Sequence, residues 1–331
     1  MGTIHSTHLQ SQHPDLLYMI EYAIQAPSGH NTQPWFFKTG ENRIEIHPDF
    51  EKALPVVDAD HRELFISLGC ALENLCIAAS EKGYGQEISI SESGIISVHL
   101  LPGGSGSGDK ELLPQIPLRQ TNRSIYNGKK VPGETISAWE KIADKESVSI
   151  YFYENGTTEF DQIKSYVEEG NRIQMRDQAF KRELKDWMRF NKKHSEKKKD
   201  GLSYLVFGAP NLPFFISKPV ISVAINERSQ VKGDLRKIDS SSHLVLFTTR
   251  QHTFSNWIEL GRTLQHFLLI TTGEGVVHSY FNQPNEIREL SVRMAGTLQL
   301  EEEYPSILLR IGYGEAMPYS KRRGIEEVLS L

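Results

Sequence analysis

The residues best suited to chemistry lie in one short polar loop, residues 26–35. Within six positions the loop carries a hydroxyl, an imidazole and two carboxamides, from Ser28, His30, Asn31 and Gln33. Such groups donate and accept hydrogen bonds, and binding groups are often found on loops that rigid elements hold in place. The alternative is a turn in which Ser28 and Asn31 satisfy only the local backbone. His30 is expected to titrate near neutrality, and no feature of the sequence makes it an acid or a base.

Regular elements are predicted on both sides of this loop. Residues 15–25 have the apolar face of an amphipathic helix, which stops at Pro27. After the loop, Trp35 starts a core strand, and residues 43–47 alternate as the second strand of a hairpin. We expect Gln33 and Trp35 to be structural rather than ligand-binding.

Two strongly apolar helices are predicted further along the chain, over residues 62–83 and 254–272. They align at a constant offset of 192 residues, which matches Gly69 with Gly261 and Gly83 with Gly275. Two unrelated core helices could match by chance. Matched glycines with strands before and after nevertheless favour two related α+β halves, which reproduce in one chain what a symmetric homodimer does with two.

The other predicted strands and helices divide the chain into two halves. Strands are predicted at 87–91, 95–101, 148–153, 220–225, 243–248, 276–281 and 306–312, and helices at 134–143, 160–190, 285–294 and 325–331. The Gly/Ser run that starts at residue 102 has the composition of a flexible linker. The predicted division is a first half at 14–101, a linker at 102–116 and a second half at 117–331. The lysine-rich run 191–200 is expected to be a solvated helix end or loop.

Composition narrows the class of protein. The 331 residues carry a net charge of −5, which argues against a nucleic-acid partner. No run of eighteen apolar residues and no signal-like segment is present, so no membrane partner is expected. His5, His8 and His13 are expected to belong to a frayed tail. Cys70 and Cys76 lie about 240° apart on one helix and cannot form a disulfide. Buried thiols fit a reducing compartment, so the protein is expected to be cytoplasmic.

Three stretches together resemble the nitroreductase superfamily. Residues 27–35 resemble its flavin-contacting loop, and residues 119–123, Arg-Gln-Thr-Asn-Arg, resemble its Arg-x-Ser/Thr-x-Lys/Arg phosphate motif. Residues 311–323 resemble its basic C-terminal motif. With residues 54–58 and 62–64 included, the chain is most similar to the fused, double-domain Acg-like branch. The resemblance runs from about residue 14 to 331. It implies an α+β fold of two fused halves, each a mixed or antiparallel sheet with helices packed around a long central helix.

The resemblance also implies one FMN site, assembled from both halves. The first half keeps the loop and the second half keeps the arginines, so one site per chain and a monomeric pseudo-dimer are expected. The residues implied to bind FMN are Ser28, His30, Asn31, Arg119, Thr121, Arg123, Ser279, Tyr280, Arg322 and Arg323.

These residues have different implied roles. Arg119, Thr121 and Arg322, with Arg323 as a neighbour, would hold the phosphate, which favours guanidinium forks and hydroxyls. Arg123 would face the N1–C2=O edge, where reduced flavin gains negative charge. The loop residues would contact the ring edge or the ribityl chain, and the 279–281 segment would run near N5. Taken singly, the arginines could instead form surface salt bridges or complement a helix end.

The activity implied by the resemblance is that of an FMN-dependent oxidoreductase. NAD(P)H would be the small-molecule electron donor, and a nitroaromatic or quinone would be the acceptor. No Gly-x-Gly-x-x-Gly fingerprint occurs, so any nicotinamide would bind over the flavin. An alternative is a protein that sequesters FMN with little turnover, with residues 187–219 as a lid. A third is another reaction of the same fold, such as dehydrogenation or flavin breakdown.

Overall fold

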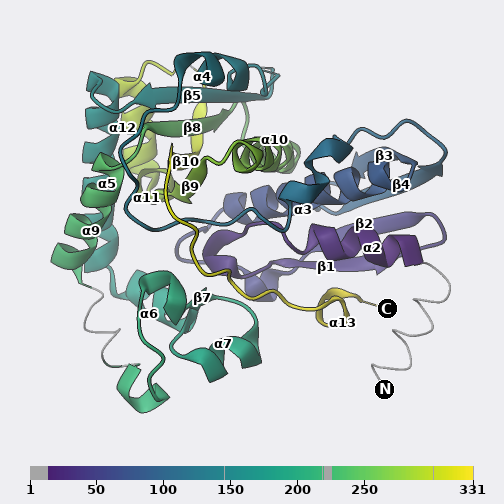
Figure 1. The fold of residues 1–331 in the computed structure, drawn as a ribbon, viewed down its shortest axis with the longest axis horizontal. Helices are drawn as coiled ribbons and strands as arrows, with labels where there is room; N and C mark the ends of the chain where they lie inside the picture. The colour runs from purple at the N-terminus through teal and green to yellow at the C-terminus, as the bar shows by residue number, and fades with distance from the viewer. Residues whose placement is uncertain (1–13, 145, 218, 220–225, 301, 331) are drawn as a thin grey trace.

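Two four-stranded antiparallel sheets form the framework of the protein (Figure 1). The computed structural model describes residues 14–144, 146–217, 219, 226–300 and 302–330. The first sheet has the order β1-β2-β4-β3. Its strands are β1 (Trp35–Thr39), β2 (Arg43–Pro48), β3 (Tyr84–Ile90) and β4 (Ile96–Pro102). The second sheet has the order β5-β8-β10-β9. Its strands are β5 (Val148–Glu154), β8 (His243–Thr249), β9 (Val277–Tyr280) and β10 (Tyr304–Gly312).

The two sheets share one topology. In each, two strands precede a long helix and two follow it, and the final strand lies inside the sheet beside the second one. The helices are α3 (Arg62–Glu81) in the first half and α10 (Phe254–Gly273) in the second. The prediction of two related α+β halves is therefore confirmed.

The two long helices pack against each other at the centre of the molecule (Figure 1). A Cβ atom added to Gly69 would lie 2.0 Å from the Ile258 carbonyl oxygen, and one added to Gly261 would lie 2.1 Å from that of Ile66. Ile66 and Ile258 are related by the same 192-residue offset, so the contact is reciprocal, as in the interface of a symmetric dimer. The predicted helix ends are also confirmed, because Gly83 and Gly275 both have positive φ.

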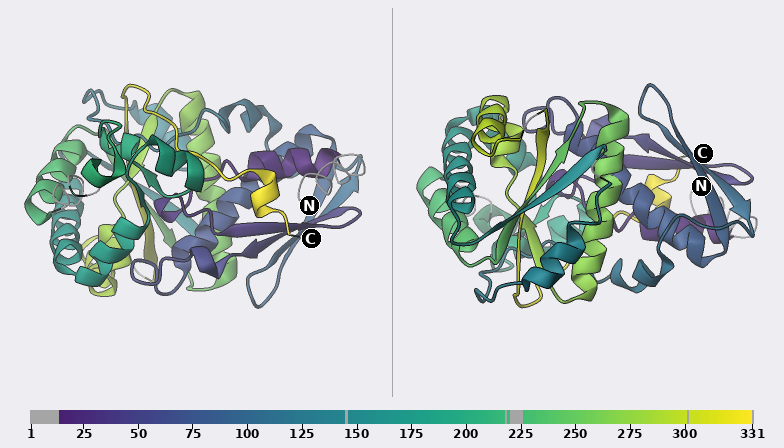
Figure 2. Two further views of the ribbon diagram at one scale, coloured as in Figure 1. Left: turned by 90° about the horizontal axis from the view of Figure 1, so that it is seen from below. Right: turned by 90° about the horizontal axis from the view of Figure 1, so that it is seen from above.

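The second sheet is covered on both faces. Val245 and Phe247 point into the core that contains α3 and α10, whereas Leu244 and Leu246 point to the opposite face. There they meet helices α5 (Thr158–Arg176), α9 (Glu227–Asp239) and α12 (Arg288–Thr297). Figures 1 and 2 show this helical layer on the side of the second sheet that faces away from the first half. Much of the second half's extra length therefore lies in insertions where the first half has short turns.

The long helix predicted at 160–190 is wrong. It is divided into α5 and α6 (Gln178–Asp186) at Asp177, whose backbone is extended and whose carboxylate accepts a hydrogen bond from the Ala179 N–H. The chain then forms the short strand β6 (Met188–Arg189), paired with β7 (Leu202–Ser203). Helix α7 (Lys192–Lys198), preceding β7, carries the lysine-rich run. The predicted helix at 285–294 is likewise divided, into α11 (Gln283–Glu286) and α12.

The remaining elements are short. They are α2 (Pro14–Ala23), α4 (Gly133–Trp139), α13 (Ile325–Val328) and the 3-10 turns Gly29–Asn31, Phe50–Lys52, Lys110–Gln115 and Tyr204–Phe207. The predicted linker packs closely on α3, because a Cβ on Gly108 would lie 2.4 Å from the Cys76 carbonyl carbon. Its glycines thus permit close approach, which differs from the expected flexible linker. The C-terminal tail returns to the first half, where the Ser330 N–H donates to the Phe37 carbonyl at 2.8 Å.

Cys70 and Cys76 are buried and do not form a disulfide, as predicted. Among the described residues, α3 is a helix long and apolar enough to cross a membrane, but it is almost entirely buried inside the protein. The strand predicted at 220–225 and the N-terminal histidines His5, His8 and His13 lie outside the described residues.

Candidate functional site

Two adjoining cavities lie where the two halves meet. The first, of about 230 Å³, is lined by Arg119, Arg123 and Arg322, and we call it the basic cavity. The second, of about 200 Å³, is lined by Glu63 and Glu286, and we call it the acidic cavity. The residues that line both are Pro27, Ser28, Thr121, Arg123 and Leu202. The sequence-predicted loop and the predicted arginines are therefore brought together from opposite halves.

The loop at 26–35 adopts an unusual backbone. His30, Asn31 and Gln33 have φ values of 47°, 57° and 55°. Non-glycine residues rarely adopt positive φ, and they persist there only when their surroundings hold them. Ser28 Oγ accepts a hydrogen bond from the Gln33 N–H at 2.9 Å, and the Gln33 carboxamide donates to the Lys199 carbonyl at 2.9 Å. Gln33 and Trp35 are fully buried and structural, as predicted.

The arginines of the basic cavity lack carboxylate partners. Arg119, only 5% exposed, donates from Nη2 to the Gln25 carbonyl at 3.2 Å, and Arg322 donates to the same oxygen at 3.4 Å. Within the described residues, Nε and Nη1 of Arg119 and Nε of Arg322 are buried without a hydrogen-bond partner, and neither arginine forms an ion pair. Burial, and then the neighbouring Arg119, lower the pKa of Arg322 to about 9. Such a pair of cations is unfavourable unless an anion joins it.

Backbone contacts position residues 119–123, the segment that resembles a phosphate-binding motif. Residues 119–123 run beside β9, where the Asn122 N–H donates to the His278 carbonyl at 2.7 Å. This places Thr121 and Arg123 between the two cavities. Burial lowers the pKa of the Arg123 guanidinium, and no hydrogen-bond partner of its side chain lies within the described residues.

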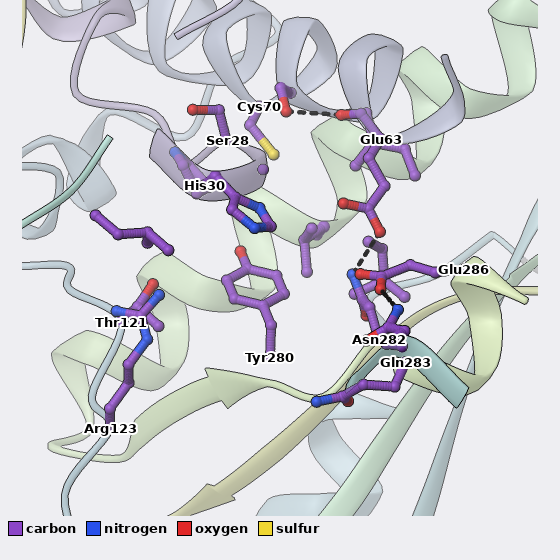
Figure 3. Close-up of a pocket in the computed structure, with 18 residues that line it drawn as sticks. Ser28, His30, Glu63, Cys70, Thr121, Arg123, Tyr280, Asn282, Gln283 and Glu286 are labelled. Carbon is purple, nitrogen blue, oxygen red and sulfur yellow. Dashed lines mark hydrogen bonds between the residues drawn. The ribbon is translucent and has the colours of Figure 1, made fainter. Parts of the chain in front are cut away.

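His30 and Tyr280 point toward each other across the acidic cavity (Figure 3). Burial, and to a lesser extent Arg123, lower the pKa of His30 to about 4. The imidazole is therefore neutral at pH 7, and the expectation that it titrates near neutrality is wrong. The Tyr280 hydroxyl is buried and has no hydrogen-bond partner in the described part of the chain, and burial raises its pKa.

Asn31 lines the basic cavity but is already engaged with protein groups. Its amide donates to the carbonyls of Gly201 and Lys321, both at 3.1 Å, and its oxygen accepts from Arg322. Asn31 therefore ties the loop to two other segments of the site.

Two predicted binding residues do not line either cavity. Ser279 alternates with Tyr280 along β9 and so faces the other side of the sheet. Arg323 donates from Nη2 to the carbonyls of Gln33 and Trp35, at 2.6 and 2.9 Å. The structure thus corrects the expectation for Arg323, which holds the loop at residues 26–35 in place and does not line the basic cavity.

The acidic cavity also contains polar residues that the sequence analysis did not identify. Glu63 Oε1 accepts from the Asn282 amide at 2.9 Å, and Glu286 accepts from the Gln174 amide (Figure 3). Burial raises the pKa of Glu286 to about 7, and burial together with the nearby Glu286 raises that of Glu63 well above its usual value. The sequence could have drawn attention to Glu63 only because it is a charged residue at the start of a strongly apolar helix.

The segment expected to form a lid reaches the cavities through Leu202, which lines both. Nearby, the buried Asp200 carboxylate binds Arg189 at 2.6 Å and Lys52 at 3.0 Å. Because Lys52 belongs to the first half, this contact fixes the base of the segment across both halves.

Among known protein families, no family model matches the chain. Two curated proteins from Mycobacterium tuberculosis strains CDC 1551 and H37Rv, which carry the provisional name NAD(P)H nitroreductase, are each 25% identical over 325 residues. The alignments cover 94% of this chain and 90% of theirs.

Solved structures with some similarity include the FMN-dependent nitroreductase NfnB of Mycobacterium smegmatis in complex with NADPH. It is 11% identical, with a TM-score of 0.43, over 67% of this chain and 98% of that one. A nitroreductase with bound FMN from Bacteroides fragilis is 12% identical, with a TM-score of 0.38, over 64% and 94%. The similarity to these curated relatives, which are named as nitroreductases, runs through nearly the whole length of the chain and agrees with the resemblance to the nitroreductase superfamily.

Proposed function

We propose that this protein is an FMN-dependent oxidoreductase that takes electrons from NAD(P)H and passes them to a small nitroaromatic or quinone-type acceptor. The observation that carries the proposal is the pair Arg119 and Arg322, two guanidiniums that share one carbonyl and have no carboxylate partner among the described residues. A dianionic phosphate would supply the missing acceptors. The NAD(P)H nitroreductase names of the curated relatives support the same activity.

The residues present fit FMN in a definite way. Arg119, Arg322 and Thr121 would hold the phosphate in the basic cavity, and Ser28 would contact the part of the cofactor that passes between the cavities. Arg123, at the junction, would face the edge of the ring system, and His30 and Tyr280 would line its space as neutral groups. When bound, FMN would supply two-electron transfer. The free, buried cysteines fit a cytoplasmic location for this activity.

Replacement of Arg119 tests the phosphate site. Arg119→Met removes a charged donor, so we expect FMN affinity to fall about 10- to 100-fold, as for the loss of one charge-assisted hydrogen bond. The melting temperature of the FMN-free protein should stay level or rise, because two unpartnered buried N–H groups are removed. Fluorescence titration with FMN measures the affinity, and Arg43→Met, at an exposed strand position, is the control. Unchanged FMN affinity in Arg119→Met would locate the phosphate elsewhere.

A second candidate function is FMN sequestration without turnover. The contact of Asp200 with Arg189 and Lys52 favours it, because a fixed segment with Leu202 over both cavities would restrict access to the ring. Anaerobic addition of NADPH or NADH to the yellow protein separates the two functions. We expect bleaching of the flavin absorbance within seconds, whereas no bleaching over many minutes would favour sequestration.

A further inference from the structure

The acidic cavity contains two carboxyl groups that come from opposite halves. Glu63 lies in the first turn of α3, and Glu286 is the last residue of α11. Both line the same cavity, and Figure 3 shows the two side chains on one wall of it. Glu63 is only 8% exposed. The other walls include the apolar side chains of Ile66, Leu202, Leu264 and Ile307.

Side-chain amides donate the hydrogen bonds that these carboxyls accept, and Arg123 is a cation on the wall of the same cavity. Asn282 donates to Glu63 Oε1, and Gln174 donates to Glu286. Glu63 Oε2 makes no hydrogen bond within the described residues. No ion pair to either carboxyl is found in the described part of the chain.

The neighbouring titratable groups have other partners. Arg62 donates to the Asn285 carbonyl at 3.0 Å, and the Asp58 carboxylate accepts from the backbone N–H groups of Glu63 and Leu64 at 2.9 Å each. Glu183 accepts from the backbone N–H groups of Val56 and Val57. His30, on the loop across the cavity, is neutral at pH 7. These contacts leave Glu63 and Glu286 without a counter-charge in direct contact.

Two largely buried carboxyls that line one cavity disfavour each other's ionisation. Glu286 is the less perturbed of the two, with a pKa of about 7, and its charge raises the pKa of Glu63 further. Burial and the charge of Glu286 both favour the protonated form of Glu63. The partnerless Tyr280 hydroxyl, which points into the same space, independently indicates that the cavity receives a polar ligand group.

We propose that Glu63, which the Asn282 amide positions and whose Oε2 has no partner among the described residues, is a proton donor to the acceptor in the acidic cavity. This inference rests on the proposed function and names a catalytic residue for it. In the overall reaction, NAD(P)H is oxidised and gives a hydride equivalent, while a quinone acceptor gains two electrons and two protons in all. The second proton breaks its bond to the Glu63 carboxyl and forms a bond to the acceptor oxygen, leaving a carboxylate. That carboxylate recovers its proton from solvent after the product leaves.

The test compares two electron acceptors in the FMN-loaded protein. 1,4-Benzoquinone needs protons to reach its product, whereas ferricyanide accepts an electron without one. In Glu63→Gln we expect kcat with benzoquinone to fall about 100-fold relative to kcat with ferricyanide, the typical contribution of a general acid. Glu63→Asp should recover part of the loss. Glu92→Gln, at an exposed turn, is the matched control and should leave the ratio unchanged.

The pH profile gives a second kinetic measurement. The wild-type benzoquinone rate should fall as pH rises through the pKa of Glu63, because the donor must be protonated. Glu63→Gln should abolish this fall, and Glu286→Gln should shift it to lower pH because the charge that raises the Glu63 pKa is gone. Equal losses with both acceptors and an unshifted profile would overturn the proposal.

A measurement without turnover separates this inference from the proposed function. Infrared difference spectra of the FMN-free protein between acid and alkaline pH should show the C=O band of a protonated carboxyl that persists at neutral pH and disappears in Glu63→Gln. Absence of that band would overturn the inference about Glu63 while leaving FMN reduction intact. Failure to reduce either acceptor, with the band present, would instead count against the proposed function.

Discussion

Burial shifts the pKa values of the individual residues around the two cavities. It lowers the pKa values of Arg119, Arg123, Arg322 and His30 and raises that of Glu286. In each case desolvation is the largest cause, so each group is driven toward its neutral form. A ligand whose anionic end contacts the arginines would raise their pKa values again. If its other end is neutral and forms hydrogen bonds, the glutamates would stay protonated.

Glu286 predicts a pH dependence of stability in the FMN-free protein. Its pKa rises from the usual 4.5 to about 7 on folding. Its contribution to the free energy of unfolding is therefore fully present below pH 4.5 and is lost as pH rises through about 7. Glu286→Gln should be no more stable than wild type at pH 4.5 but more stable at about pH 8, because Gln174 can still donate to the new amide oxygen. Urea unfolding at the two pH values measures this, and an equal effect at both would contradict it.

Some of the site residues could be predicted because their chemistry lies in contiguous sequence. The loop from Ser28 to Gln33 and the spacing of Arg119 and Arg123 are visible without a structure. Ser279 could not be excluded, because its position beside Tyr280 does not show which face of β9 meets the cavity. Glu63 and Glu286 could not be paired, because their proximity depends on the packing of the two halves.

At the scale of the helices and strands, the close contact between α3 and α10 depends on two glycines. In Gly69→Ala the new methyl group would overlap the Ile258 carbonyl, so the helices would have to separate. We expect the free energy of unfolding to fall by about 3 kcal/mol, the upper end of the usual range for overpacking. Gly233→Ala in α9, where an added Cβ meets nothing within 4 Å, is the control. It should stabilise the protein by about 0.5–1 kcal/mol through helix propensity. Similar stabilities for the two variants in urea unfolding would contradict this role of Gly69.

Apolar periodicity identified the two central helices and the core strands, because these elements are buried on most sides. It failed in the helical layer, where one side faces solvent. Helix α9 buries few residues, among them Val231 and Ile238, so its apolar pattern is too weak to predict a helix. The helix is divided at Asp177 because the side chain of this residue caps the start of a new helix. The spacing of apolar residues in the sequence does not reveal such a cap.

At the scale of the whole molecule, the fused halves predict the stoichiometry of the cofactor. The loop occurs in the first half and the arginines in the second, so we expect one FMN per chain. We also propose that the boundary between the halves lies at residues 102–116. Flavin absorbance measured against protein concentration, with light scattering for the molar mass, tests the count. A monomer of 37.6 kDa with one FMN is expected. Two FMN molecules per chain would show that a second site is intact.

The 192-residue relation assigns Cys70 and Arg262 to equivalent positions, yet their surroundings differ. Cys70 lines the acidic cavity, whereas Arg262 binds Glu73 at 3.2 Å. In a homodimer encoded by a single gene, every substitution appears twice, so an arginine that strengthens the contact between helices would also enter the space reserved for the ligand. In a single chain with two halves the two positions can differ. Arg262 pairs with Glu73 between the helices, while Cys70 keeps the cavity wall small and uncharged.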